Sequence, residues 1–127
     1  MSRLEPGKEE IRQLLKLPKD QPVTMLNLLK FKKTTVESKT GREMYQDYME
    51  AIAPLLKKIK ARPVFLGDTK INLAGMGDWD MVALIKYPSP RAFLEMVSSK
   101  EYTEIAHLRK DALEDTLLLA NLKISNL

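Results

Sequence analysis

The sequence predicts an α+β fold built on one four-stranded antiparallel sheet. Segments with a helical spacing of apolar residues alternate with short runs typical of strands. Three of those runs are apolar on both faces of a strand, which is unusual for a sheet that faces water on one side. Such a sheet needs cover on both sides, yet the chain offers only about three helices.

The N-terminal half is expected to contain a short helix, a strand and a long helix. Pro6 suits the first position of the short helix. The strand Val23–Phe31 (VTMLNLLKF) follows it. Thr40 and Glu43 then form a capping box, in which the threonine hydroxyl accepts a hydrogen bond from the Glu43 amide, so a long helix should begin there.

The C-terminal half is expected to contain three strands and an interrupted helix. Residues 62–74 form a strand with a break or bulge at residues 67–68. The turn signal at residues 75–78 (GMGD) joins it to an antiparallel strand over residues 79–87. A helix capped by Ser89 restarts at a capping box over residues 98–101, and the last strand covers residues 117–124.

After the first helix the order is therefore β-α-β-β-α-β, which is the ferredoxin-like arrangement. Both crossovers should be right-handed, so their helices lie on the same face of the sheet. The 127 residues suit a single domain, residues 1–127, with residues 1–20 as a helical extension and residues 22–125 as the ferredoxin-like core.

The second face of this sheet predicts a partner. In the first strand Met25, Asn27 and Leu29 point to one side, and Leu26 and Leu28 to the other. We expect Leu26 and Leu28 to meet the helices, and the Asn27 side to face a second copy of the chain or a cavity beside it. A homodimer with its sheets face to face buries an apolar patch larger than monomers usually expose. The alternative is that the N-terminal helix caps this face within one chain.

Residues spread over the chain follow the pattern of one known family. They are residues 25–31, Gly41, Tyr45, Tyr48, residues 62–63, Gly67, residues 79–80, residues 87–89, Phe93, Met96, Tyr102, Arg109 and residues 113–115. In this pattern the chain resembles the bacterial domain-of-unknown-function family 1330, of the dimeric α+β barrel superfamily. The resemblance implies a ferredoxin-like fold that forms a dimeric α+β barrel, and it implies no particular reaction. Lys60 and Ala61 depart from the family pattern, which has glycines there.

Composition narrows the chemistry. The chain has no cysteine and a single histidine, so a thiolate zinc site and a cysteine nucleophile are excluded, and we expect no metal and no other cofactor. The net charge of +4 comes from 21 basic and 17 acidic residues that are mostly interspersed, so nucleic acid is not the expected partner. The sequence shows no secretory signal and no apolar run of about 20 residues, which predicts a cytoplasmic protein without a membrane partner.

Seven residues are candidates for a ligand pocket, although none can be given a catalytic role. They are Asn27, Tyr48, Trp79, Asp80, Tyr102, His107 and Arg109. Asn27 lies on an apolar strand and must be hydrogen-bonded, either by a ligand or by the protein. Tyr102 and Arg109 are seven residues apart and share a helix face. Arg109 either pairs with Asp80, which is the preferred interpretation, or holds an anionic group of a substrate.

The other candidates each have a plain structural interpretation as well. His107 would suit a general base at neutral pH, but a lone helical histidine is more often a surface residue. Trp79 walls a pocket or belongs to a dimer core. Tyr48 brings a hydroxyl to a pocket mouth or simply packs in the core.

Three functions fit these features. The preferred one is the binding or conversion of a small, mostly apolar metabolite without a metal or nucleotide cofactor. An enzyme of this kind would be similar to the cofactor-free monooxygenases or isomerases of the superfamily. The second is a structural or interaction dimer with no ligand. The third is an RNA-binding module, since the RNA-recognition motif shares the element order, but Thr24 stands where that motif needs an aromatic residue.

Overall fold

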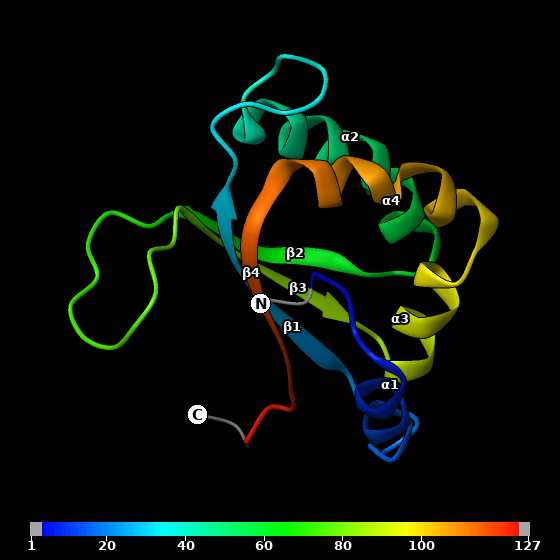
Figure 1. Ribbon diagram of the computed structural model, residues 1–127. Coiled ribbons are helices and arrows are strands. Elements are labelled where there is room, and N and C mark those ends of the chain that lie inside the picture. The colour runs from blue at the N-terminus through cyan, green and yellow to red at the C-terminus, as the bar shows by residue number, and fades with distance from the viewer. Residues whose placement is uncertain (1–3, 125–127) are drawn as a thin grey trace.

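The computed structural model describes residues 4–124, and its four strands form one antiparallel sheet (Figure 1). The elements are α1 (Lys8–Leu15), β1 (Val23–Phe31), α2 (Gly41–Lys58), β2 (Arg62–Asp68), β3 (Met81–Tyr87), α3 (Pro90–Val97), α4 (Lys100–Ala112) and β4 (Leu113–Asn121). The strand order is β2-β3-β1-β4, and every neighbouring pair is antiparallel. The predicted ferredoxin-like fold is thereby confirmed.

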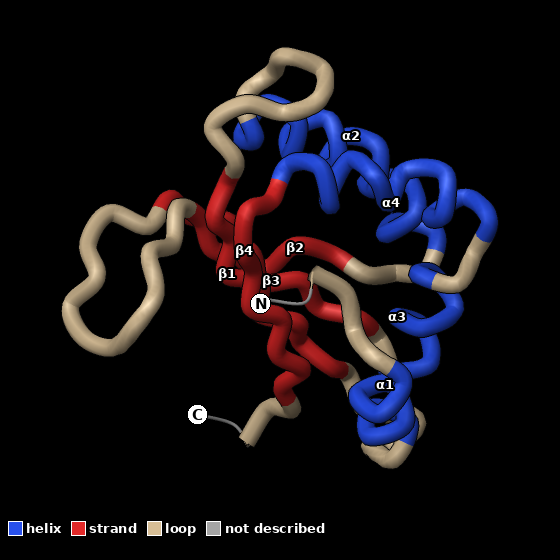
Figure 2. The backbone as a smooth tube through the Cα atoms, in the orientation of Figure 1, coloured by secondary structure: helices blue, strands red, loops and turns tan. Residues whose placement is uncertain are grey.

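The longer helices lie on one side of the sheet, which we call the helix face (Figures 1 and 2). α2 packs against α4, while α1 contacts α3 at the end of the same layer. No helix within residues 4–124 covers the opposite side, which we call the open face. The helices that follow β1 and β3 therefore share one face, as right-handed crossovers require.

The two faces of β1 are the reverse of our expectation. Val23, Met25 and Leu29 are almost fully buried and belong to the core beneath the helices, together with Met44 of α2. Leu26 and Leu28 are only half-buried and point to the open face. A strand that is apolar on both sides carries no periodic signal to say which side meets the helices. Asn27 on the helix face was misread as a sign of the partner side.

Direct cross-strand partners lie on the same face, so the pairing register identifies the open face. Leu26 of β1 is opposite Leu84 of β3 and Leu119 of β4, and Leu84 is opposite Phe65 of β2. Leu28 is likewise opposite Val82 and Leu117. The open face is thus a continuous apolar surface across all four strands, made of Leu26, Leu28, Phe65, Val82, Leu84, Leu117 and Leu119.

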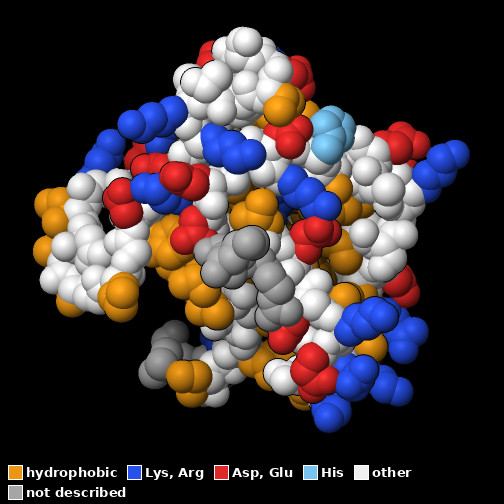
Figure 3. All heavy atoms as spheres, in the orientation of Figure 1, with side chains coloured by type: hydrophobic (Ala, Val, Ile, Leu, Met, Phe, Trp, Pro, Cys, Tyr) orange, Lys and Arg blue, Asp and Glu red, His pale blue; other side chains and the backbone are white. Residues whose placement is uncertain are grey.

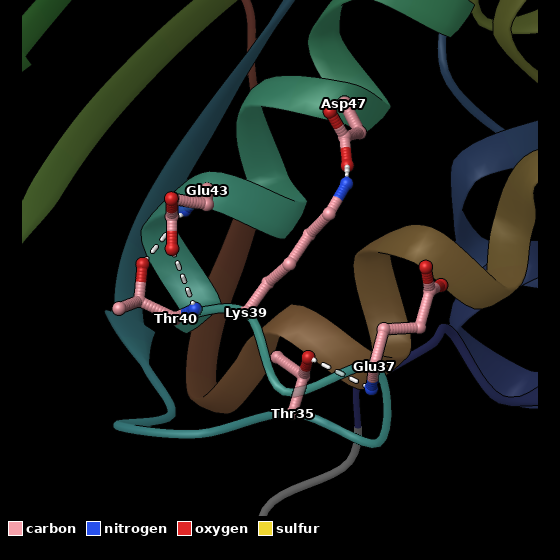
Figure 4. A network of polar contacts seen from close by, with 6 residues as sticks. All are labelled: Thr35, Glu37, Lys39, Thr40, Glu43 and Asp47. Carbon is pink, nitrogen blue, oxygen red and sulfur yellow. Dashed lines mark hydrogen bonds and ion pairs between the residues drawn. The ribbon is translucent and has the colours of Figure 1, made fainter.

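The start of α2 confirms the predicted capping box (Figure 4). The Thr40 hydroxyl accepts from the Glu43 amide at 3.1 Å, and the Glu43 carboxylate accepts from the Thr40 amide at 2.9 Å. Lys39 adds an ion pair with Asp47 at 2.6 Å. Gly41 follows the cap, and a side chain there would collide with the backbone oxygens of Lys32 and Ala112. Only glycine lets α2 start this close to the end of β1.

Four boundaries differ from the predictions. α1 begins at Lys8 after an N-cap at Gly7, so Pro6 lies outside it. β2 ends at Asp68, its irregularity lies between Pro63 and Phe65, and β3 begins only at Met81. Residues 69–80 therefore form a loop that projects from the sheet instead of a tight hairpin (Figure 1). They have no partner strand within the described chain, so their apolar residues do not produce a ladder.

The last strand is shifted toward the N-terminus. β4 covers Leu113–Asn121, because the chain passes directly from α4 into the strand and Leu113 already pairs with Phe31. The predicted interruption between α3 and α4 is confirmed, with Ser99 as the N-cap of α4. The break thus lies one residue later than the expected cap at Ser98.

Lys60 explains the departure from the family pattern. It follows the C-terminal end of α2 and has a φ of 63°, which is the left-handed region that favours glycine. The family's glycine suits this backbone without strain, whereas Lys60 adopts it at a cost.

Candidate functional site

A small cavity lies between the helix face of the sheet and the helices. Its volume is about 100 Å³. All four tyrosines of the chain, Tyr45, Tyr48, Tyr87 and Tyr102, line it, and we call it the tyrosine cavity. Apolar side chains of β1, α2, β3 and α3 form most of the remaining wall, among them Met25, Ile52, Ile85 and Met96.

The aromatic rings form a connected cluster. Tyr45 and Tyr48 of α2 lie 5.3 Å apart between ring centroids. The Tyr48 and Tyr102 hydroxyls are 2.9 Å apart and hydrogen-bonded, which joins α2 to α4 across the cavity. Tyr87 stacks edge-to-face on Phe93 of α3 at 5.0 Å. The phenols therefore bring polar atoms into an apolar space while their rings pack as core.

Burial keeps the cavity phenols neutral. It raises the pKa of Tyr45 to about 12, against the opposing effect of the nearby Arg109 charge. Burial is also the largest cause that raises the pKa of Tyr48, followed by its neighbour Tyr102. The pKa of Tyr87 is raised for the same reason. At neutral pH these side chains are hydrogen-bond donors and acceptors, not phenolate bases.

Arg109 of α4 supplies the positive charge of the cavity. Its side chain is only 8% exposed. It donates from Nη1 to the Leu4 carbonyl at 2.7 Å, and from Nη2 to Asn27 Oδ1 at 3.5 Å and Thr116 Oγ1 at 3.4 Å. The expected ion pair with Asp80 is wrong. Asp80 lies at the end of the projecting loop, where its carboxylate accepts from the Phe31 amide at 2.8 Å.

The seven predicted residues thus separate into two groups. Asn27, Tyr48, Tyr102 and Arg109 line the tyrosine cavity together. Trp79, Asp80 and His107 do not. Trp79 lines a second cavity of about 470 Å³, Asp80 anchors the end of β1, and His107 is exposed on α4. Periodicity placed Tyr102 and Arg109 correctly, since both point inward from one helix face.

Sequence reasoning missed Thr116, Tyr87 and the N-terminal segment, by which we mean residues 4–6. The segment lies between the two cavities and lines both of them. Thr116 could have been noticed as a polar residue in an apolar strand, in the same way as Asn27. The position of the segment carries no sequence signal, because it follows from tertiary packing of a chain end.

Metal binding finds no support in the described residues. Within residues 4–124 no group of three or more His, Asp or Glu side chains could hold a metal ion. The same residues contain no helix long and apolar enough to cross a membrane.

Comparisons with known proteins place this geometry in a fold group. The RPA0582 protein of unknown function from Rhodopseudomonas palustris is 28% identical, with a TM-score of 0.90, over 99% of this chain and 100% of that one. A dimeric protein of unknown function with a ferredoxin-like fold from Bacteroides fragilis is 16% identical, with a TM-score of 0.56, over 84% and 100%. The hydroxynitrile lyase from Passiflora edulis is 12% identical, with a TM-score of 0.61, over 85% and 98%.

Identities of 16% and 12% indicate a shared fold alone. No curated protein sequence matches the chain. The family model for the domain of unknown function DUF1330 matches residues 34–122, which is most of the chain and includes α2, α3, α4 and three of the four strands. The protein therefore belongs to the DUF1330 family.

Proposed function

We propose that the protein binds a small, mostly apolar metabolite in the tyrosine cavity and either carries it or converts it without a metal or nucleotide cofactor. One observation carries the proposal: four phenols, an amide and a guanidinium converge on an otherwise apolar space between sheet and helices. Ligand sites commonly combine an apolar wall with a few convergent polar groups. The hydroxynitrile lyase with the same fold supports the idea that this fold can host an enzyme.

The test is a screen of small hydroxylated aromatics and lactones by thermal shift, with the binding site checked by a substitution. Met49 lines the cavity and is half-buried at its rim, so Met49→Trp should narrow it. Met76→Trp is the matched control, because Met76 is 98% exposed at the loop tip. We expect Met49→Trp to weaken binding of a hit about tenfold or more and Met76→Trp to leave it unchanged. A screen without hits, or hits that bind both variants equally, would refute the proposal.

We also propose that a second copy of the chain covers the open face. Phe65, Leu117 and Leu119 are 55%, 41% and 44% exposed in the single chain. Hydrophobic side chains are visible on the sheet beside the projecting loop and on the loop itself (Figure 3). Burying such a surface stabilises by about 25 cal/mol per Å². Two ferredoxin-like proteins of similar fold, from Bacteroides fragilis and Thermobifida fusca, are described as dimeric.

Sedimentation equilibrium measures the assembly directly. We expect a homodimer at micromolar protein concentration, with both open faces buried. A monomer at that concentration would rule out the dimer and leave the cavity proposal intact, since every residue lining the tyrosine cavity belongs to one chain.

A further inference from the structure

Arg109 is a buried cation whose hydrogen-bond partners are all uncharged. Leu4, Asn27 and Thr116 supply a carbonyl, an amide oxygen and a hydroxyl. None of the ion pairs found within residues 4–124 includes Arg109. A charge that leaves water is normally paired, because neutral hydrogen bonds return only part of its hydration free energy.

We propose that Arg109 is the anchor for the carboxylate of a small organic acid that enters the tyrosine cavity. This inference rests on the proposed function and deepens it by naming the ligand class. The planar guanidinium matches a carboxylate through two parallel N–H···O bonds. The apolar wall of the cavity then takes the hydrocarbon part of the acid, and the phenols lie within the same enclosure.

The protein holds the guanidinium in place from beneath. Asn27 Nδ2 donates to the Ala83 carbonyl at 3.3 Å, which turns its Oδ1 toward Arg109. The Thr116 hydroxyl donates to the Leu28 carbonyl at 2.8 Å, so its oxygen is left to accept from Arg109. Both acceptors are thus oriented by the sheet itself. A cation fixed in this way is preorganised for an anion.

The two carboxylates nearest the cavities are already engaged. Glu5 lines the tyrosine cavity, but its carboxylate pairs with Lys110 at 2.6 Å on the surface, where it is 60% exposed. Asp115 lines the second cavity, and its carboxylate accepts from the Thr116 amide at 2.8 Å. Neither bonds to Arg109, so an external acid is the partner of matching charge.

Size limits which acids enter. A cavity of about 100 Å³ has room for a short acid such as butanoate, since cavities of about 150 Å³ accommodate benzene. The Leu4 carbonyl now occupies the outer donor of Arg109, and the N-terminal segment separates this cavity from the neighbouring space of about 470 Å³. A larger acid such as benzoate would replace the Leu4 carbonyl and extend into that space.

The experiment compares each acid with its neutral amide. Butanoate is titrated against butanamide, and benzoate against benzamide, by NMR with detection of arginine Nε–Hε signals. We expect the acids to shift the Arg109 signal and to bind about tenfold or more tightly than the amides, because charge-assisted hydrogen bonds are the stronger ones. Equal affinity of acid and amide would overturn the carboxylate inference and would leave the proposed function standing.

Variants locate the effect. Arg109→Gln should remove the preference for acids, whereas Arg91→Gln, at an exposed arginine of α3, should not. Asn27→Asp gives Arg109 an internal carboxylate and should abolish acid binding while the protein stays folded, which keeps the test valid if Arg109→Gln does not fold. Acid binding that survives in Asn27→Asp, or that is lost equally in Arg91→Gln, would place the anion on the surface. Binding of neither acid nor amide would overturn the inference, and the thermal-shift screen with the Met49→Trp variant would still test the proposed function separately.

Discussion

The helix face and the open face of the sheet are both apolar, yet they are built differently. The helix face includes Asn27, Thr116 and the buried Arg109, whose polar atoms bond to one another and to the backbone. The open face consists of hydrocarbon and one phenyl ring between polar rims, such as Lys86 and Asn121. A polar network inside an apolar layer is costly unless it is satisfied, and it is typical of binding sites. A smooth apolar face is better suited to a protein partner.

The first and largest test of this comparison places a charge on the open face. Leu26→Glu should raise the dissociation constant of the proposed dimer about a thousandfold, because the symmetric contact would bury two unpaired carboxylates. Leu15→Glu is the matched control, since Leu15 is 54% exposed on α1. Sedimentation equilibrium should show monomers for the first variant and unchanged assembly for the second. Two variants with equal masses in solution would mean that the open face is not the interface.

Adjacent leucines of β1 provide the second test, because they point to opposite faces. Leu29 is fully buried under the helices, so Leu29→Ala should cost about 2–5 kcal/mol of unfolding free energy at any protein concentration. Leu28→Ala should destabilise strongly only where the dimer forms, so its cost should grow with protein concentration. Urea unfolding at two protein concentrations measures both. A concentration-independent cost for Leu28→Ala would argue that the open face stays bare.

The sequence predicted the elements of these two faces better than their orientation. Strand Val23–Phe31, the Thr40 cap and the β-α-β-β-α-β order are local patterns, and each was confirmed. The exchange of Leu26 and Leu28 with Met25 and Leu29 was not local. A strand that is buried on both sides has lost the alternation that would reveal its inner face.

The candidate site was predictable for the same reason that the elements were. Helical spacing places Tyr102 and Arg109 on one face, and an isolated polar residue in an apolar strand directs attention to Asn27. The link from Arg109 to Leu4 joins residues at opposite ends of the chain, and no spacing rule reaches that far. The Asp80 pairing failed because a loop, not a tight turn, holds Asp80 away from the helix face.

The third test concerns the helix face and pH. An unfolded tyrosine ionises near pH 10, whereas burial holds the pKa of Tyr45 at about 12 and raises those of Tyr48 and Tyr87. The stability contributed by these neutral phenols is therefore present below pH 10 and is lost as pH rises from 10 toward 12. The loss is about 1.4 kcal/mol per pH unit for each tyrosine.

Denaturant unfolding between pH 9 and 11.5, with tyrosinate absorbance followed in parallel, measures this loss. Tyr45→Phe should reduce the slope by about a third, since it removes one of the three phenols that titrate late. Full tyrosinate absorbance near pH 10 in a protein that retains its native circular dichroism would show that the cavity phenols are open to water. That result would weaken the contrast between a closed helix face and an open second face.

The last and smallest test separates folding from assembly. Lys60 has a φ of 63°, so Lys60→Gly should relieve strain of about 1–2 kcal/mol and return part of that as unfolded-state entropy, for a net gain of about 0.5–1 kcal/mol. Residue 60 is exposed and belongs to neither face of the sheet. The unfolding free energy should therefore rise while the dimer dissociation constant and ligand affinity stay the same. A change in the dissociation constant would mean that the turn between α2 and β2 contacts the partner, which would extend the interface beyond the seven residues of the open face.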